Sequence, residues 1–452
     1  MMAMQLSEAA QILAGRYTGT DVPFLGVSTD TRQLQPGSLF FALQGPNFDG
    51  HGFVEAAREQ GAVAAAVTRR CQSTLPQIEV ADTRLALGSL SAHWRQQFSL
   101  PVIAITGSNG KTTVRAMTAA VLAHCGRTLA TQGNLNNDIG LPLTLARLGA
   151  DDQFAVLELG ANHAGEIDYL AAIAQPSIAV ITNAGPAHLE GFGDLEGVAR
   201  AKGELFARLG AAGVAVINAD DAFAPLWREL AGHCRVVEFG LQGAEVTADW
   251  QGDTTGSDIR LHTPAGSIDL RLSLPGRHNV MNALAACAVA LAAGADLEAV
   301  RQGLESLSPV AGRFNVHSLP GGVTLIDDTY NANPESLQVA LDVLALADGD
   351  SWLVLGDMGE LGAGAAALHG AAGRMAREAG VTRLYGLGEL AQAAVAAFDG
   401  PGGAFSTMDE LLATLRNEMS GPLQILVKGS RRMRMEGVVA ALRAHPEAGE
   451  LH

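Results

Sequence analysis

The residues with the clearest chemistry lie between positions 102 and 113, which read Val-Ile-Ala-Ile-Thr-Gly-Ser-Asn-Gly-Lys-Thr-Thr. The apolar start predicts a buried parallel strand, which breaks into a glycine-rich turn. In such a loop Gly107 and Gly110 let backbone N–H groups face phosphate oxygens, and Lys111 brings a positive charge to the β- and γ-phosphates. The segment therefore predicts an ATP site formed by Gly107, Ser108, Asn109, Gly110, Lys111, Thr112 and Thr113.

Oxygen and nitrogen donors near this loop predict a magnesium site. The hydroxyl of Thr112 or Thr113 is placed to bind Mg²⁺, at the start of a helix expected from Val114 to Cys125. Glu158 ends an apolar strand, and an acid at the tip of a strand beside such a loop is an expected second ligand. His188 follows another strand through a Gly-Pro turn and is a candidate for a second metal, although a histidine there is more often a loop cap.

Strands and helices alternate around these residues. We expect a helix over 84–98 and strands over 154–159, 178–182 and 214–218. This alternation predicts a doubly wound parallel sheet that binds ligands at the carboxyl ends of its strands. Short alternating strands between Glu245 and Leu274 predict an antiparallel flap on the same domain.

Length divides the chain into three units, since 452 residues exceed a single core at about 150 residues per domain. We expect a small N-terminal α/β domain over 1–83, the P-loop domain over 84–312 and a Rossmann-like C-terminal domain over 313–452. Strands of the last domain are predicted at 323–326, 352–355, 383–386 and 424–427. The fold class is therefore α/β in three domains, with a doubly wound central sheet.

Net charge and hydropathy limit the classes of partner that the protein is expected to bind. Thirty Lys and Arg stand against 47 Asp and Glu, giving a net charge of −17 that repels nucleic acid and anionic bilayers. The start of the chain resembles no signal peptide, and the longest Ala/Leu-rich stretch, 283–293, is shorter than the ~20 residues that span a bilayer. We expect a cytoplasmic protein without a membrane span, and a monomer.

The loop departs from the general pattern G-x-x-x-x-G-K-[ST], because Ile105 stands at the first position. The variant T-G-x-N-G-K-T-T resembles the loop of the Mur ligase and folylpolyglutamate synthetase superfamily. Segments 276–283, 312–314 and 327–334 resemble those that hold the purine, ribose and phosphates of ATP there, although each is also ordinary cap or turn chemistry. The resemblance implies ATP contacts from Asn279, Asn282, Arg313, Asp328, Tyr330 and Asn331.

Lys202 gains a role only through this resemblance. Alone, a lysine in the helical string Ala-Lys-Gly-Glu is a solvated side chain. In the Mur ligases a lysine in this context is commonly carbamylated, which turns it into an anion that binds Mg²⁺. The resemblance implies two Mg²⁺ ions held by Thr112, Glu158, His188 and carbamylated Lys202, and catalytic roles for Lys111, Glu158, His188 and Lys202.

The strings at 131–142, 355–362 and 427–436 resemble the superfamily branch that joins D-alanyl-D-alanine to UDP-N-acetylmuramoyl-tripeptide through an acyl phosphate. The D-N-P-R string of the preceding ligase is missing from the sequence. The resemblance implies that the UDP-sugar peptide is bound by Ser28, Thr29, Asp30, Arg32, Asn134, Asn136, Asn137 and Asn162. Lys428, Ser430 and Arg431 are candidates to hold the dipeptide carboxylate, and a basic helix start at the surface is the alternative interpretation.

Two alternatives stay open at this point. One is a related ligase that adds another amino acid, or a glutamate as in folylpolyglutamate synthesis. The other is a P-loop kinase or nucleotide switch, which would need only the central domain. A switch has no use for segments 134–138 and 428–431, and it would hydrolyse nucleotide without acceptor and amine.

Overall fold

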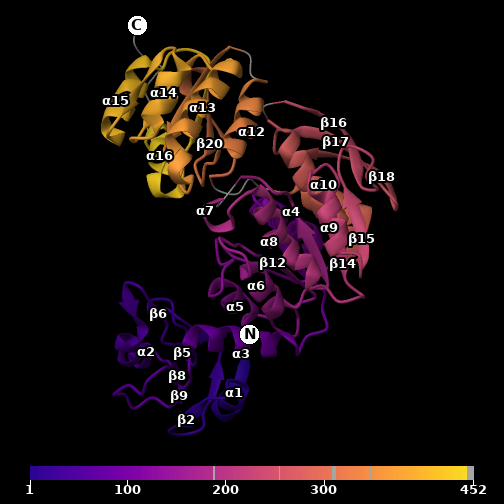
Figure 1. The fold of residues 1–452 in the computed structure, drawn as a ribbon, viewed down its shortest axis with the longest axis vertical. Helices are drawn as coiled ribbons and strands as arrows, with labels where there is room; N and C mark the ends of the chain where they lie inside the picture. Colours follow the sequence, from indigo (N-terminus) through magenta and orange to yellow (C-terminus); the bar gives the residue numbers. More distant parts are fainter. Residues whose placement is uncertain (187–188, 254, 308–311, 347–348, 445–452) are drawn as a thin grey trace.

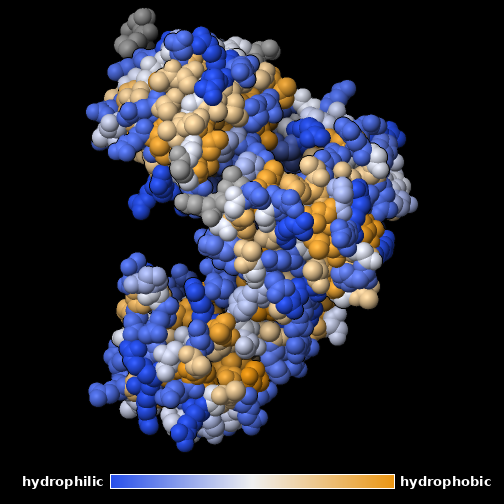
Figure 2. Space-filling model, in the orientation of Figure 1, coloured by the Kyte–Doolittle hydropathy of each residue, from blue (hydrophilic) through white to orange (hydrophobic). Residues whose placement is uncertain are grey.

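The computed structural model describes residues 1–186, 189–253, 255–307, 312–346 and 349–444. The three largest sheets come from three successive parts of the chain and form an α/β architecture, and the first and last parts lie at opposite ends of the central one (Figure 1). The space-filling view shows an open gap between these two end parts (Figure 2). Within the described ranges, no helix is long and apolar enough to cross a membrane.

The N-terminal part contains a five-stranded sheet in the order β2-β9-β8-β5-β4, a β1-β3 pair and a β6-β7 hairpin. In the larger sheet only the β2-β9 pair is antiparallel. The strands are β1 (Ala3–Gln5), β2 (Arg16–Thr18), β3 (Pro23–Leu25), β4 (Val27–Ser28), β5 (Leu39–Phe41), β6 (Gln44–Gly45), β7 (Phe48–Asp49), β8 (Ala64–Val67) and β9 (Gln77–Glu79). The helices are α1 (Leu6–Ile12), η1 (Gly50–Phe53) and α2 (Val54–Glu59).

The central part contains a six-stranded parallel sheet in the order β11-β12-β10-β13-β14-β15. Its strands are β10 (Val102–Thr106), β11 (Thr128–Ala130), β12 (Phe154–Glu158), β13 (Ile178–Ile181), β14 (Val214–Asn218) and β15 (Arg235–Phe239). Its helices are α3 (Thr83–Arg95), α4 (Lys111–Ala123), α5 (Gly140–Leu145), α6 (Glu166–Ala174), α7 (Leu189–Phe192), α8 (Leu195–Ala207), α9 (Ala224–Leu230), α10 (Arg277–Ala292) and α11 (Leu297–Glu305). The chain builds one side of β10 and then the other, so a crevice opens at the carboxyl end of β10.

Alternation along the buried strands fills two cores, one on each face of this sheet. Ile103 and Ile105 of β10 pack with α4 and α10, whereas Val102 and Ala104 pack with α5 and α6. The antiparallel sheet β16 (Thr247–Gly252), β17 (Ser257–Thr263) and β18 (Gly266–Leu272) joins the first core. The two packed faces fix β10, and with it the loop that follows.

The C-terminal part contains a second six-stranded sheet in the order β19-β20-β24-β21-β22-β23, parallel except for β19. Its strands are β19 (Asn315–Leu319), β20 (Val323–Asp328), β21 (Asp350–Gly356), β22 (Arg383–Leu387), β23 (Gly402–Phe405) and β24 (Leu423–Lys428). Its helices are η2 (Pro320–Gly322), α12 (Pro334–Leu344), η3 (Gly362–Gly364), α13 (Ala365–Glu378), α14 (Ala391–Phe398), α15 (Met408–Glu418), η4 (Arg431–Met433) and α16 (Glu436–Arg443).

The N-terminal part packs on the central part through an apolar core. Leu87 and Leu90 of α3 share one buried cluster with Met2 and Phe24 of the N-terminal part and with Ala146, next to α5. The Met2 N–H also donates to the Ala146 carbonyl at 2.7 Å. These two parts are therefore joined by buried side chains as well as by the chain itself.

The expected α/β class and doubly wound central sheet are confirmed, as is the antiparallel flap. The predicted P-loop helix began at Val114, which was wrong: α4 begins at Lys111. The first turn of α4 therefore carries the phosphate-binding residues themselves. In the two six-stranded sheets, four strands had not been predicted, namely β11, β15, β19 and β23.

Candidate active site

The loop after β10 needs glycine at two positions. Gly107 has φ +150°, and a Cβ there would lie 1.8 Å from the Thr182 hydroxyl oxygen. Gly110 has φ +81°, and a Cβ there would lie 2.4 Å from Oδ1 of Asn282. Only glycine accepts these backbone conformations together with such close neighbours. The loop leads directly into α4, whose positive N-terminal end faces an incoming anion.

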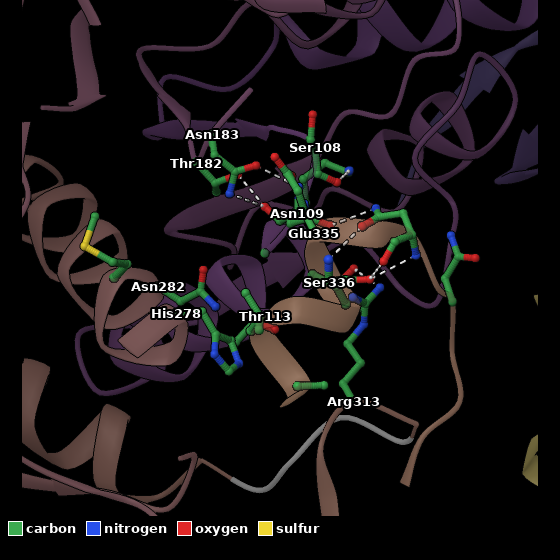
Figure 3. A pocket seen from close by; sticks show the side chains of 18 of the residues that line it. Ser108, Asn109, Thr113, Thr182, Asn183, His278, Asn282, Arg313, Glu335 and Ser336 are labelled. Atoms are coloured by element: carbon green, nitrogen blue, oxygen red, sulfur yellow. Dashed lines mark hydrogen bonds between the residues drawn. The ribbon is translucent and has the colours of Figure 1, made fainter. Parts of the chain in front are cut away.

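Side chains at the end of β13 hold the loop from beneath. The Asn109 carbonyl accepts hydrogen bonds from the Thr182 hydroxyl at 2.6 Å and from Nδ2 of Asn183 at 3.2 Å. The Asn109 N–H donates to Oδ1 of Asn183 at 2.9 Å, and Figure 3 shows these three residues together. The central sheet therefore fixes the loop backbone in its curled form.

Lys111 lies folded over its own loop. Its Nζ donates to the carbonyls of Gly107 at 2.6 Å and Ser108 at 3.1 Å. Burial lowers the pKa of Lys111, the Arg313 charge lowers it further, and the Glu158 carboxylate opposes both. A triphosphate would restore a counter-charge to this ammonium and replace the two carbonyl contacts.

Glu158 lies at the tip of β12, where it pairs in register with Ile105 of β10. Its Oε1 accepts from Nδ2 of Asn136 at 2.9 Å, and its N–H donates to the Thr131 hydroxyl at 3.0 Å. Its Oε2 is buried and, among the described residues, has no hydrogen-bond partner; Nε of Arg115 is 3.7 Å away. An orphaned carboxylate oxygen at this place fits the donor set of a hard divalent cation.

The described side chains contain no group of three or more His, Cys, Asp or Glu that could hold a metal. This sparse donor set suits Mg²⁺, which usually keeps several waters and binds one or two carboxylates plus substrate phosphates. Thr112 and Glu158 line the same cavity and supply one oxygen each. His188 lies outside the described residues, so its role as a metal ligand stays a prediction.

Lys202 is buried on α8 and is not among the described residues that line the cavity. Its Nζ lies 5.9 Å from the centroid of the Phe192 ring. Burial holds the pKa of Lys202 well below its usual value, and the Lys111 charge lowers it further. The interpretation of Lys202 as a solvated lysine, which its sequence context alone suggested, was wrong because the side chain is buried.

A cavity of about 660 Å³ lies between the central and C-terminal parts. It brings together almost the whole predicted nucleotide set, with Asn136, Glu158 and Lys428 added. The predicted residues that line it are Ser108, Asn109, Gly110, Lys111, Thr112, Thr113, Asn279, Asn282, Arg313, Asp328, Tyr330 and Asn331.

The C-terminal wall of the cavity reaches the P-loop with an arginine. Nη2 of Arg313 donates to the Thr112 hydroxyl at 3.0 Å, and its guanidinium stacks 4.1 Å from the centroid of the Tyr330 ring. Lys428, at the end of β24, is ion-paired with Asp328 and donates to the Asn331 carbonyl at 3.0 Å. Lys428 therefore holds the cavity wall in this structure.

Several predicted substrate residues lie away from the cavity. In the N-terminal part, Arg32 forms an ion pair with Asp30 at 2.6 Å, and the Ser28 hydroxyl donates to the Asp30 carbonyl at 3.0 Å; Thr29 lies between them. Their role in binding the UDP-sugar stays a prediction.

Other predicted substrate residues are held by hydrogen bonds within their own part of the molecule. Asn137 accepts from the Gly140 N–H at 2.8 Å at the start of α5, and Asn134 lies in the preceding turn. The Asn162 N–H donates to Glu166 at 2.7 Å. In the C-terminal part, the Ser430 hydroxyl donates to the Asp357 carbonyl at 2.6 Å, and Arg431 is paired with Glu436 at 3.0 Å. The Arg431 guanidinium also lies 6.0 Å from the centroid of the Tyr330 ring, which lines the cavity.

The structure adds residues that had not been predicted as site residues. Arg115, beside Glu158, could have been found because it follows Lys111 by four positions on one helix face. Thr182 and Asn183 had signals only as polar residues at a strand end. Burial lowers the pKa of the His278 imidazole to about 4, and its ring centroid lies 6.1 Å from that of Phe314.

Comparisons with known proteins agree with this geometry. Three family models match: "Mur ligase family, catalytic domain" over residues 23–95, "Mur ligase middle domain" over 105–290 and "Mur ligase, glutamate ligase domain" over 312–431. The chain is 44% identical to the UDP-N-acetylmuramoyl-tripeptide–D-alanyl-D-alanine ligase of Escherichia coli, with 98% of this chain and 99% of the relative covered.

Solved structures give the same result. MurF from Acinetobacter baumannii superposes with a TM-score of 0.93 at 39% identity, covering 98% of this chain and all of that one. MurF from Thermotoga maritima in complex with ADP gives a TM-score of 0.84 at 27% identity, covering 93% and 97%. The chain therefore belongs to the Mur ligase family, among the UDP-N-acetylmuramoyl-tripeptide–D-alanyl-D-alanine ligases.

Proposed function

We propose that the protein joins D-alanyl-D-alanine to the tripeptide of UDP-N-acetylmuramoyl-tripeptide in an ATP-dependent reaction that yields the pentapeptide precursor, ADP and phosphate. The observation that carries the proposal is the cavity in which the P-loop, Glu158 and Arg313 meet. The name of the Escherichia coli relative supports the choice of acceptor and amine. A sister ligase or a folylpolyglutamate-type ligase is the alternative.

The chemistry requires activation because a carboxylate oxygen is a poor leaving group. Transfer of the γ-phosphoryl group to the terminal carboxylate of the tripeptide forms an acyl phosphate and releases ADP. The amine of D-alanyl-D-alanine then attacks the acyl carbon, the amide bond forms, and phosphate leaves with the oxygen that it had received. Both steps bring anions together, so positioning and charge neutralisation supply much of the rate.

The residues of this chain divide these tasks. The N–H groups of the loop and of the first turn of α4 receive the phosphates, and Lys111 neutralises charge on the transferred group. Arg313 contributes from the C-terminal wall, where its fork of donors suits phosphate oxygens. Thr112 and Glu158 would hold Mg²⁺. When bound, Mg²⁺ would offset the negative charge of the phosphates.

We extend the proposal to Lys202 and His188. A buried amine with a lowered pKa is uncharged more often than a solvated one, and the uncharged form attacks CO₂ to give a carbamate. Carbamylation would form an N–C bond to CO₂ and release one proton from the amine, which gives an anion suited to a second Mg²⁺, with His188 as a further ligand. This supports the two-metal form of the site.

The remaining expectations are proposals of the same kind. The N-terminal domain over 1–83 would bind the UDP-sugar through Ser28, Thr29, Asp30 and Arg32, with Asn134, Asn136, Asn137 and Asn162 along the peptide. The C-terminal domain over 313–452 would bind the dipeptide through Lys428, Ser430 and Arg431 and would close on the ATP domain over 84–312. We propose a cytoplasmic monomer, which suits the nucleotide substrates.

The test is phosphate release from ATP and Mg²⁺ with UDP-N-acetylmuramoyl-tripeptide, measured with and without D-alanyl-D-alanine. Release should require both substrates and yield a pentapeptide, and Lys111→Ala should abolish it while leaving the fold intact by circular dichroism. Release that is indifferent to the dipeptide would contradict the assignment. Release with glutamate or another amino acid would favour the alternative ligases.

A further inference from the structure

The C-terminal part contributes a carboxylate to the cavity rim that the proposed reaction does not use. Glu335 accepts a hydrogen bond through Oε2 from Nδ2 of Asn109 at 2.9 Å. Asn333, two residues earlier, donates through its own Nδ2 to Oδ1 of Asn109 at 3.2 Å. Both ends of one P-loop amide are thus held by the same helix start in another part of the molecule (Figure 3).

The start of α12 is built to present these two side chains. Asn333 is the N-cap: its Oδ1 accepts from the Ser336 N–H at 2.8 Å, and the Ser336 hydroxyl accepts from the Asn333 N–H at 3.0 Å. Pro334 fixes the first helical position. The capping bond uses Oδ1 of Asn333, so its Nδ2 is left to reach Asn109. Glu335 lies in the first turn, where a carboxylate is favoured.

The central part has a small space for the Glu335 carboxylate beside Gly185, which we call the notch. A Cβ at Gly185 would lie 1.8 Å from Oε2 of Glu335, so the carboxylate fits only because residue 185 is glycine. The Ser108 hydroxyl donates to the Gly185 carbonyl at 3.0 Å, which ties this notch to the P-loop. Glu335 therefore contacts the loop and its support together.

The proposed phosphate contacts do not use the side-chain amide of Asn109. The proposed nucleotide contacts use backbone N–H groups, Lys111 and a threonine hydroxyl, whereas the Asn109 backbone is held by Thr182 and Asn183. The contacts of the Asn109 side chain with the C-terminal part are therefore compatible with the proposed nucleotide contacts. A contact of this kind transmits the conformation of the loop to the orientation of α12.

We propose that Glu335 is a positioning residue that, through Asn109, couples the C-terminal part to the P-loop and holds the loop ready for ATP. The inference rests on the proposed ATP site and adds a residue that neither the sequence motifs nor the reaction requires. The role is one of hydrogen bonding, so the shape of the carboxylate matters more than its charge.

Four variants separate this role from others. Glu335→Ala removes the contact, and Glu335→Gln keeps an acceptor oxygen but removes the charge. Asn109→Ala removes the partner, and Asn109→Ala with Glu335→Ala closes a double-mutant cycle. The matched control is Asp409→Ala, because Asp409 is an exposed acid in the first turn of α15, outside the residues that line the cavity.

Nucleotide affinity is measured first, by equilibrium binding of ATP to the full chain without the other substrates. We expect Kd for ATP to rise about three- to tenfold in Glu335→Ala and in Asn109→Ala, which corresponds to one hydrogen bond. Glu335→Gln should stay within about twofold of wild type, and the double variant should bind no more weakly than either single one. Under ligation conditions KM for ATP should rise while KM for the tripeptide stays unchanged.

The inference is wrong if the effects of Glu335→Ala and Asn109→Ala on Kd for ATP add up in the double variant. It is also wrong if Glu335→Gln and Glu335→Ala raise Kd equally. Tighter ATP binding in both Glu335 variants would likewise overturn it, because the carboxylate would then act by repulsion. A fall in thermal stability equal to that of Asp409→Ala, with unchanged Kd, would reduce Glu335 to a helix-end residue. A failure of the proposed function is distinguishable from these outcomes, because the wild-type protein itself would then bind no ATP or release no pentapeptide.

Discussion

Glu158 has incomplete contacts in this structure, because one buried carboxylate oxygen has no hydrogen-bond partner among the described residues. We expect Glu158→Gln to fold normally, since Gln can still accept from Nδ2 of Asn136, yet to lose its hold on divalent cations. The reaction should slow by about 10²-fold or more at low Mg²⁺ if the charge contributes about 3 kcal/mol to the transition state.

The measurement is Mn²⁺ binding by electron paramagnetic resonance, together with phosphate release over a range of Mg²⁺ concentrations. Glu196→Gln is the control, because Glu196 is an exposed acid on α8 paired with Arg200 at 2.7 Å. Unchanged Mn²⁺ affinity in Glu158→Gln would remove Glu158 from the metal site.

The pKa of His278 leads to a prediction about stability at acidic pH. Its folded pKa of about 4 lies below the ordinary value of 6.5, so the unfolded chain binds more protons between these values. Stability from this group is therefore present above pH 6.5 and is lost as pH falls toward 4. Because His278 is partly exposed, we expect the free energy of unfolding to fall by only about 1–2 kcal/mol between pH 7 and pH 5.

His278→Gln should reduce the fall in Tm between pH 7 and pH 5 by roughly 4 °C. The exposed His124 supplies the control variant His124→Gln. An acid-induced fall that is the same in wild type and His278→Gln would show that the imidazole titrates normally in the folded protein.

The turn between β10 and α4 shows what a single element demands of its sequence. Gly110→Ala would force an alanine to φ +81° and place its Cβ 2.4 Å from Oδ1 of Asn282. Gly165, at φ +85°, has nothing within 4 Å of the position that a Cβ would take, so Gly165→Ala carries the backbone cost alone. That cost is about 1 kcal/mol, and we expect Gly110→Ala to lose about 2 kcal/mol or more.

Urea unfolding of both variants measures the difference, and ATP binding should weaken in Gly110→Ala alone. Equal losses in the two variants would show that Asn282 moves aside without cost. The comparison separates the cost of the close contact with Asn282 from the cost of placing alanine at a positive φ.

Elements differed in how well the sequence predicted them. Strands β10, β12, β13 and β14 are apolar runs bounded by polar or glycine residues, so composition alone locates them. Strands β19 and β23 were missed because β19 alternates partly exposed residues and β23 begins with two glycines. Their strand character comes from the neighbouring strands with which they pair, which local propensity does not report.

The site was predictable where a motif names it and unpredictable where tertiary packing creates it. The P-loop, Glu158 and Arg313 follow from strand ends and from the family resemblance. Glu335 carried no signal, because its role depends on a notch at Gly185 that lies 150 residues earlier in the sequence. Lys202 had the appearance of a solvated lysine, and only the packing of α8 shows that it is buried.

Across the molecule, the two interfaces of the central part differ in kind. The N-terminal interface buries Leu87, Leu90, Met2 and Phe24, and separating it would expose apolar side chains at about 1.5–3 kcal/mol each. The described polar contacts of the C-terminal interface include Arg313 to Thr112 and the Asn109 pair. Such bonds are worth about 0.5–1.5 kcal/mol each, and the bond from Arg313 to Thr112 can be exchanged for a contact with phosphate.

We therefore expect ATP to move the C-terminal part and to leave the N-terminal part in place. Spin labels at the exposed Glu229 on α9 and Glu378 on α13 report the first distance, and labels at Glu79 on β9 and Glu229 report the second, in a chain whose four cysteines are replaced by alanine. A non-hydrolysable ATP analogue with Mg²⁺ should shorten the first distance by more than the width of its distribution, while the second stays constant.

The relative strengths of the two interfaces determine what each measured distance change would mean. A shift in the second distance with no shift in the first would mean that the apolar interface is the weaker one, against the burial of its side chains. A shift in neither distance would mean that the cavity accepts nucleotide without rearrangement, and the open gap in Figure 2 would then have to be spanned by the extended UDP-sugar peptide itself. The Glu335→Ala variant extends the test, because loss of its contact with Asn109 should broaden the first distance distribution before ATP is added.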